Sequence, residues 1–200
     1  MAADPDGAVV LRERPRITDE TLAACWALPE GASRCCASVL CSRAGAGTFG
    51  NAYAQFMGVR RFSPRDRPPV RFVDDEELAY VAVRYREVHD LWHVLFGCDT
   101  TVAGEVALKA VEAVQTGLPS TALAALFGPL RLSRPRRAEL ARTQLPWALR
   151  AGAVATDLLC LRYEQHWAEP LPLLRARWRI ATAPPFAHAG RRNTKASSKI

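Results

Sequence analysis

The feature that most constrains this fold is a long run of apolar residues at helical spacing that ends at Gly97. The residues that recur every three or four positions are Leu78, Val81, Val88, Leu91, Trp92, Leu95 and Phe96. This spacing places them on one face of an α-helix. Asp74 and Glu77 resemble a capping box at the start of the run, and glycine is typical of the position just after a helix. Such a helix needs partner elements to cover its apolar face.

The segments around this run also carry helix signals. Thr100 or Thr101 is suited to cap a second long helix that ends at residues 117–119, so the two helices should form an antiparallel pair around a short turn. Pro119 opens a short apolar helix, and others are predicted near residue 22 and over residues 51–57, 135–145, 146–168 and 170–179. No segment alternates apolar and polar residues as strands do. The sequence therefore predicts an all-α, irregular single-domain helical bundle.

The length of 200 residues is typical of one domain with loose ends. Residues 1–50 are expected to form an irregular N-terminal arm with one short helix and an atypical insertion, residues 32–46, that holds three cysteines. Residues 51–182 are expected to form a helical, metal-binding catalytic core, and residues 183–200 a disordered basic tail. No secretory or transit peptide is visible, and no apolar run is long enough to cross a membrane.

The positive charge of the chain is concentrated toward its C-terminus. The net charge is +7, but residues 1–128 hold 13 basic and 16 acidic residues, whereas residues 129–200 hold 14 basic and 4 acidic ones. Nearly all of the basic residues are arginines, whose planar guanidinium pairs well with phosphate. The charge predicts an anionic partner and by itself fits either a lipid surface or a nucleic acid.

Four side chains at the end of the first long helix and the start of the second form a candidate metal site. His89, Asp90 and His93 lie within one arc of the helix, and two histidines at positions i and i+4 are a common grip on a divalent metal. The short turn should return Glu105 alongside them, with Gly104 allowing the two backbones to approach. Two histidines and two carboxylates suit Zn²⁺, with Fe²⁺ or Mn²⁺ as alternatives.

Other metal-enzyme classes fit this pattern less well. A zinc protease of the HExxH type uses a glutamate after the first histidine, where this chain has Asp90. A phosphohydrolase with a His-Asp pair needs another metal-binding histidine upstream, but His166 and His188 lie downstream. Glu112 is interpreted as a charge on the helix surface. Beyond the metal ligands, the sequence identifies no catalytic residue.

The motif resembles that of a known family. His89, Asp90, His93 and, after eleven residues, Glu105 are similar to the HDxxH…E zinc motif of the mitochondrial ubiquinone (coenzyme Q) biosynthesis protein four family. The flanking residues 71–80, 84–88, 112–119 and 127–129 agree with the same family, and the resemblance runs with gaps from about residue 14 to about residue 185.

This resemblance implies a fold, a location and a reaction. The family is all-helical and peripheral on the matrix side of the mitochondrial inner membrane, within the multi-enzyme assembly that makes ubiquinone. It is assigned the C1 decarboxylation of a 4-hydroxy-3-methoxy-5-polyprenylbenzoate, with C1 hydroxylation associated with that step. The implied ligands of the metal are His89, Asp90, His93 and Glu105, which would make the protein a lyase.

Partners follow from the same reasoning. The expected ones are the polyprenylated substrate, other enzymes of the ubiquinone-synthesis complex and an anionic membrane surface, but no nucleic acid. Four apolar residues near the short helix suit the lining of a lipid channel: Leu118, Leu123, Leu126 and Phe127. The alternative hypothesis is a non-catalytic organiser that holds lipid intermediates for other enzymes of that complex.

Overall fold

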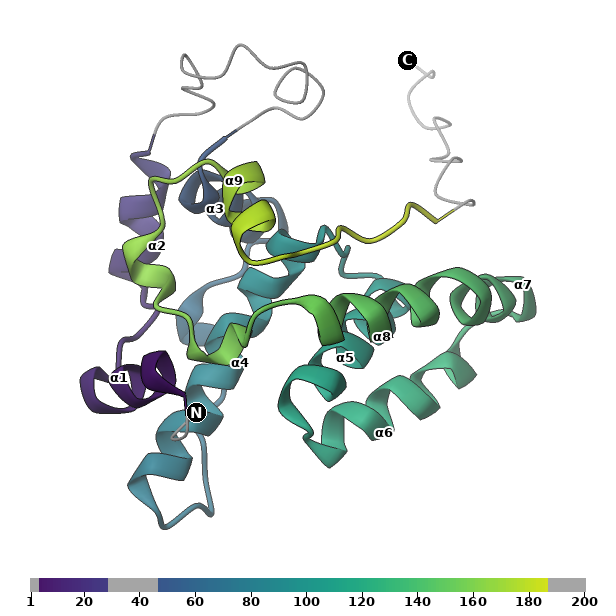
Figure 1. The fold of residues 1–200 in the computed structure, drawn as a ribbon, viewed down its shortest axis with the longest axis horizontal. Coiled ribbons are helices and arrows are strands. Elements are labelled where there is room, and N and C mark those ends of the chain that lie inside the picture. Colours follow the sequence, from purple (N-terminus) through teal and green to yellow (C-terminus); the bar gives the residue numbers. More distant parts are fainter. Residues whose placement is uncertain (1–3, 29–46, 187–200) are drawn as a thin grey trace, which may run out of the picture.

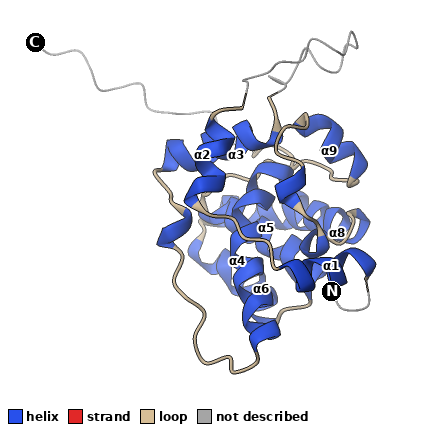
Figure 2. Cartoon of the chain, turned by 90° about the vertical axis from the view of Figure 1, so that its left-hand side faces the viewer, coloured by secondary structure: helices blue, strands red, loops and turns tan. Residues whose placement is uncertain are grey.

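The computed structural model describes residues 4–28 and 47–186 (Figure 1). Within these residues all regular elements are helices, apart from one isolated bridge between Thr48 and Pro170 (Figure 2). The predicted all-α class is confirmed. The α-helices are α1 (Pro5–Glu13), α2 (Asp19–Trp26), α3 (Phe49–Arg60), α4 (Glu76–Phe96), α5 (Val102–Thr116), α6 (Pro119–Phe127), α7 (Arg134–Glu139), α8 (Leu145–Val154) and α9 (Leu171–Arg177).

The predicted pair of long helices is present as α4 and α5. The cap of α4 is Asp75, which accepts a hydrogen bond from the Leu78 amide, so the helix begins one residue later than the Asp74 pattern suggested. Gly97 ends α4 in the left-handed conformation, with φ of 69°, and Thr101 caps α5. His93 contacts the first turn of α5 while Tyr85 contacts its last turns, so the two helices are antiparallel.

The N-terminal segment holds two helices where the sequence predicted one. Helix α1 begins at Pro5 after Asp4, whose side chain accepts from the Gly7 amide. It is anchored by Val10, which is fully buried. Its nine residues are fewer than the roughly 11 to 18 over which helical periodicity is read, which explains why it was missed. The predicted insertion at residues 32–46 lies outside the described residues.

The helical run after residue 133 differs from the prediction near Pro146 and at its C-terminal end. A π-turn, Leu140–Gln144, joins α7 to α8 without a break at Pro146, because wider hydrogen-bond spacing accommodates a residue without an amide proton. The helix predicted for residues 146–168 ends at Val154 instead. The chain beyond it forms two 3₁₀ turns, Leu158–Cys160 and Tyr163–Gln165, the second of which buries the Tyr163 ring.

The prediction of disorder from residue 183 onward is wrong for residues 183–186. The Ala183 amide donates to the Phe96 carbonyl at 2.7 Å, and the Gln144 side chain donates to the Pro184 carbonyl at 2.7 Å. These two bonds fix the segment against the ends of α4 and the π-turn. Residues 187–200 lie outside the described residues.

The main core surrounds the second half of α4. Trp92 is fully buried there, and its indole N–H donates to the Tyr163 hydroxyl at 3.0 Å. Buried side chains from α3, α5, α8 and α9 complete the cluster, with Phe49, Leu108, Ala148 and Leu174 among them. Close packing on several sides restrains the last turns of α4, which carry His89 and His93.

Candidate metal centre

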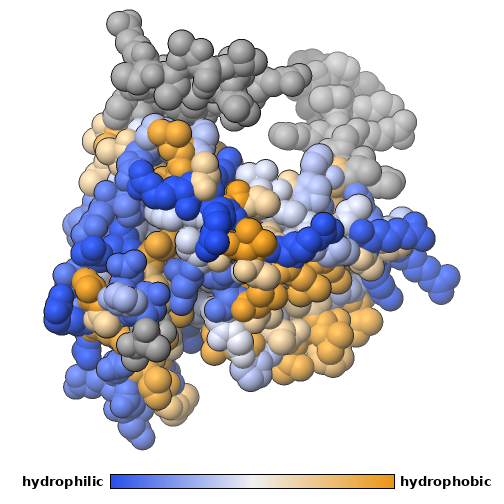
Figure 3. Space-filling view, viewed as in Figure 1, coloured by the Kyte–Doolittle hydropathy of each residue, from blue (hydrophilic) through white to orange (hydrophobic). Residues whose placement is uncertain are grey.

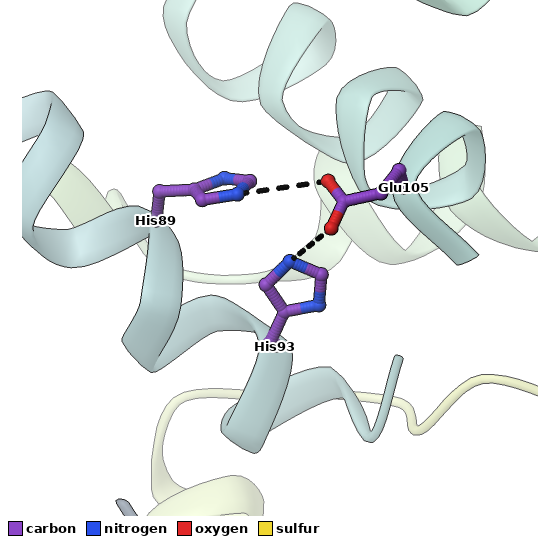
Figure 4. A group of neighbouring side chains, drawn as sticks. All are labelled: His89, His93 and Glu105. Atoms are coloured by element: carbon purple, nitrogen blue, oxygen red, sulfur yellow. Dashed lines mark ion pairs between the residues drawn. The ribbon is translucent and has the colours of Figure 1, made fainter. Parts of the chain in front are cut away.

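His89 and His93 lie one turn apart on α4 and face Glu105 of α5 (Figure 4). The Nε2 atom of His93 is 3.1 Å from one carboxylate oxygen of Glu105, and that of His89 is 3.7 Å from the other. One ligand atom from each of the three residues lies within 4.8 Å of the others. The two rings are nearly perpendicular, so their nitrogens approach the carboxylate from different directions. This is a compact set of donors for one divalent cation.

The turn between the two helices brings Glu105 to this point. Thr101 caps α5 by accepting from the Gly104 amide at 3.2 Å, which places Glu105 in the first helical turn. A Cβ atom at Gly104 would overlap the carbonyl oxygen of Asp99. The close approach at Gly104 is therefore between the first turn of α5 and the turn that precedes it, whereas the sequence predicted that the backbones of the two long helices approach there.

The outer nitrogen of each imidazole is occupied by an acceptor. Nδ1 of His93 lies 3.1 Å from the Cys98 carbonyl oxygen, and Nδ1 of His89 lies 2.5 Å from a carboxylate oxygen of Glu112. A carbonyl or carboxylate can only accept, so both Nδ1 atoms carry the proton. With a cation between these atoms, each imidazole would be neutral and present a lone pair at Nε2 to the ion; without the cation, Nε2 of His93 can instead donate to the Glu105 carboxylate at 3.1 Å. A cation between these atoms satisfies all of them, so the residues fit a divalent metal.

The charges around the site keep both glutamates ionised. Burial by itself raises the pKa of Glu105, but the hydrogen bond from His93 and the charges of His93, His89 and Lys109 outweigh it and hold the pKa below its ordinary value. Burial likewise opposes ionisation of Glu112, and the hydrogen bond from His89 together with the charges of His89 and Lys109 holds its pKa low as well. Deprotonated carboxylates are the form that metals bind.

Glu112 is not the surface charge that the sequence suggested. Its side chain is 0% exposed, and besides His89 it accepts from the Lys109 ammonium at 2.7 Å and from the Tyr85 hydroxyl. A sequence signal did exist, because Glu112 lies seven residues, or two helical turns, after Glu105 and therefore on the same side of α5. Burial and the Glu112 charge raise the pKa of the Tyr85 phenol, which stays protonated as a donor.

Asp90 is placed differently from the other three predicted ligands. Its carboxylate pairs with the Arg67 guanidinium at 2.7 Å, and Arg67 also contacts the Tyr53 hydroxyl. The rotation of about 100° between adjacent helix positions turns Asp90 toward the loop before α4. The structure thus brings together His89, His93 and Glu105, with Asp90 paired to an arginine beside them. The assignment of Asp90 as a fourth ligand stays a prediction.

Comparisons with known proteins show the family to which the chain belongs. The family model for "Coenzyme Q (ubiquinone) biosynthesis protein Coq4" matches residues 1–184. The chain belongs to the Coq4 family. The "Ubiquinone biosynthesis protein COQ4 homolog, mitochondrial" of Bos taurus is 46% identical over 192 residues, which cover 95% of this chain and 66% of that one. The Homo sapiens protein of the same name is also 46% identical, over 93% of this chain and 64% of that one.

This Coq4-family chain therefore spans just under two thirds of the length of the curated relatives it matches. A crystal structure of a protein from Nostoc punctiforme PCC 73102 has the same fold, with a TM-score of 0.65 and 24% identity over 88% of this chain and 76% of that one. In the described ranges, 4–28 and 47–186, no helix has the length and apolar character needed to cross a membrane.

The surroundings of the site in this Coq4-family chain combine aromatic and basic groups. A shallow, open surface depression lies beside His93. Its wall includes Phe56, which stacks on the His93 ring, and the guanidinium groups of Arg60 and Arg175. The residues suggested from the sequence as channel lining lie instead on the surface of α6, where Leu118, Leu123, Leu126 and Phe127 are exposed.

Proposed function

We propose that this chain acts in ubiquinone biosynthesis as a metal-dependent lyase that removes the C1 carboxylate of a 4-hydroxy-3-methoxy-5-polyprenylbenzoate. One observation carries the proposal: Nε2 of His89, Nε2 of His93 and the carboxylate of Glu105 lie within 4.8 Å of one another in a chain that belongs to the Coq4 family. Three protein ligands with an open position are typical of catalytic zinc sites. Fe²⁺ and Mn²⁺ accept the same donors.

The proposed reaction breaks the bond between ring carbon C1 and the carboxylate carbon. Carbon dioxide leaves, the electron pair of the bond stays on the ring, and C1 takes up a proton. A bound divalent ion supplies Lewis acidity that holds the anionic substrate and stabilises the charge that develops on it. Hydroxylation at C1 replaces that proton with a hydroxyl group and removes two electrons, so it also requires an oxidant such as dioxygen.

The protein contributes to this reaction by positioning the metal ligands and by attracting the anionic substrate. The Nδ1 contacts of His89 and His93 fix both rings before substrate arrives, which lowers the reorganisation needed during reaction. Arg60 and Arg175 supply positive charge at the neighbouring depression, where an aromatic acid could be drawn in. Phe56, which stacks on His93 and lies beneath the Arg60 guanidinium, adds apolar surface to the wall.

The proposal is tested with purified protein and a short-chain prenylated acid that carries ¹³C in its carboxyl group. We expect wild-type protein to bind about one metal ion per chain and to release labelled carbon dioxide, and Glu105→Gln to lose both. His166→Gln is the matched control, because the His166 imidazole pairs with Glu169, which is not a member of the cluster, and the substitution should leave both readouts unchanged. Comparing products with and without oxygen separates C1–H from C1–OH formation.

A second candidate function is a non-catalytic organiser that holds lipid intermediates for other enzymes of the pathway. It is favoured by the α6 surface, which we define as Leu123, Leu126, Phe127 and Leu130. All four side chains are exposed, Leu126 by 66%, and Figure 3 shows apolar residues gathered over this part of the molecule. Patches of this kind mark interaction sites. Stoichiometric metal without release of carbon dioxide would favour this function.

We also propose a peripheral location on the matrix side of the mitochondrial inner membrane. The relatives named above are called mitochondrial, and arginines at positions 131, 134 and 136 follow the α6 surface directly. An anionic lipid surface attracts such residues by about 1 kcal/mol each. Binding to anionic vesicles that weakens in Leu126→Gln, with no binding to duplex DNA, is the expected result; a preference for DNA would count against it.

A further inference from the structure

Glu112 is a buried carboxylate whose partners come from both helices of the candidate metal centre. It sits two turns after Glu105 on α5 and is 0% exposed. A carboxylate in such a position is costly unless hydrogen bonds and opposite charges compensate it. Three donors do so here: the imidazole of His89, the ammonium of Lys109 and the hydroxyl of Tyr85.

The two oxygens of Glu112 have different partners. Oε1 accepts from Nδ1 of His89 at 2.5 Å. Oε2 accepts from Lys109 Nζ at 2.7 Å and from the Tyr85 hydroxyl, and these two donors are themselves linked at 3.0 Å. Lys109 and Tyr85 therefore hold the carboxylate from one side, so that Oε1 faces Nδ1 of His89, and the Lys109 Nζ atom lies 3.4 Å from the same nitrogen.

The two histidines differ in what holds them. His93 donates to the main-chain carbonyl of Cys98, which no substitution removes, whereas His89 depends on a side chain. We infer that Glu112 is a positioning residue that keeps the proton of His89 on Nδ1 and so leaves Nε2 as the ligand atom. The inference rests on the proposed metal centre, and carboxylates that orient ligating histidines in this way also raise their basicity.

We expect replacement of Glu112 by glutamine to move the His89 proton. The amide has one acceptor oxygen, and the positive charge of Lys109 together with the Tyr85 hydroxyl should turn that oxygen toward them. The amide NH₂ then faces Nδ1 of His89, which must become an acceptor. The His89 proton moves to Nε2, where it blocks the atom that faces Glu105.

The experiment measures zinc affinity and the His89 tautomer in the full chain. We expect Glu112→Gln to bind Zn²⁺ 10- to 100-fold more weakly in competition with a chromophoric chelator, the range typical for such partners. In metal-free protein labelled with ¹⁵N-histidine, the His89 resonances should change from the Nδ1–H to the Nε2–H pattern. Adding Lys109→Met to Glu112→Gln removes the charge that attracts the amide oxygen. The oxygen can then turn toward His89, which should restore much of the zinc affinity and of the Nδ1–H tautomer.

Glu87→Gln is the matched control. Glu87 is also a buried carboxylate, 3% exposed, but it accepts from the Arg16 side chain and the Ile17 amide instead of a histidine. The Glu87→Gln substitution should lower the thermal stability about as much as Glu112→Gln and leave zinc affinity and the His89 tautomer unchanged. Losses of the same size in both variants would mean that Glu112 acts through stability alone, and the inference would fall.

The outcome also separates this inference from the proposed function. Wild-type protein that binds Zn²⁺, with the affinity and tautomer unaltered in Glu112→Gln, would overturn the positioning role and leave the metal centre in place. Wild-type protein that binds no Zn²⁺, with a tautomer change in Glu112→Gln, would uphold control of the His89 proton and sink the proposed metal chemistry.

Discussion

Within residues 84–93 of helix α4, the first half (84–87) and the second half (89–93) bury polar side chains in different ways. In the first half, Arg84 is 0% exposed and donates to both carboxylate oxygens of Glu164, at 2.5 and 3.1 Å, and Glu87 accepts from Arg16 at 2.7 Å. In the second half, His89 and His93 each have one nitrogen held by an acceptor and the other directed at Glu105. The first half pairs permanent charges, and so does Asp90 with Arg67 in the second half, whereas the two histidines do not.

This difference separates a structural role from a ligand-binding one. An arginine paired with a carboxylate is complete within the protein and has no atom to offer a ligand. A neutral imidazole with its Nδ1 proton donated retains a lone pair at Nε2 that only a proton or a cation can use. The comparison predicts that substitutions of Arg84 and Glu87 change stability and that substitutions of His89 and His93 change metal binding.

The largest expected effect is on stability, from Arg84→Met. Removal of the guanidinium leaves the Glu164 carboxylate without its partner, and breaking a buried pair typically costs about 3–5 kcal/mol. Urea denaturation of metal-free protein should show this loss. Zinc affinity of the fraction that remains folded should match wild type. A loss of zinc affinity as large as that of Glu105→Gln would break the division between the two halves.

The next effect is on metal binding, from His93→Asn. An asparagine amide can occupy the position of Nδ1 and still donate to the Cys98 carbonyl, but it provides nothing at the position of Nε2. We expect the fold to be retained and zinc affinity to fall by more than about 100-fold, which exceeds the usual effect of residues around the ligands. Circular dichroism and chelator competition measure the two; unchanged affinity would remove His93 from the centre.

The third effect tests the turn between α4 and α5, which brings Glu105 to the two histidines. In Gly104→Ala the new methyl group overlaps the Asp99 carbonyl oxygen, so the first turn of α5 must shift. Overpacking of this kind costs about 1–3 kcal/mol. Because Glu105 is the next residue, zinc affinity should fall together with stability. Gly117→Ala is a useful contrast: no atom lies within 4 Å of its new methyl, and only backbone strain at φ of 66° is added.

Much of the site could be predicted because its determinants are local. The spacing of His89 and His93 follows from one helix, and a short turn with Gly97 and Thr101 at its ends returns Glu105 to the same place. Likewise α4, α5 and α6 have strong periodic patterns, caps and stops. In each case the interaction that decides the structure joins residues close together in sequence.

The features that were missed depend on contacts between distant segments. The orientation of Asp90 is set by Arg67, 23 residues upstream, and the burial of Glu112 depends on Tyr85 and His89 of the other helix. The turns over residues 155–170 follow from burial of Tyr163 against Trp92, 71 residues away. The spacing of residues within one helix does not show which of its polar side chains will contact a distant segment of the chain.

The smallest effect concerns a partly exposed ion pair, which can be compared with the pair of the buried Arg84. Glu169 accepts from His166 at 2.6 Å and from Arg177, and the hydrogen bond from His166, with that of Arg177, holds the pKa of Glu169 below 4.5. A carboxyl whose pKa is lowered on folding stabilises the folded state above its unfolded pKa, so this contribution declines as the pH falls below about 4.5.

Because these groups are partly exposed, the contribution should be under about 1 kcal/mol. Unfolding free energies of metal-free protein between pH 6 and pH 3 should therefore fall slightly less steeply in Glu169→Gln than in wild type. The Arg84 guanidinium is 0% exposed, so its pair with Glu164 is screened less. A stabilisation by Glu169 as large as the whole free-energy loss in Arg84→Met would mean that burial does not set the strength of these pairs.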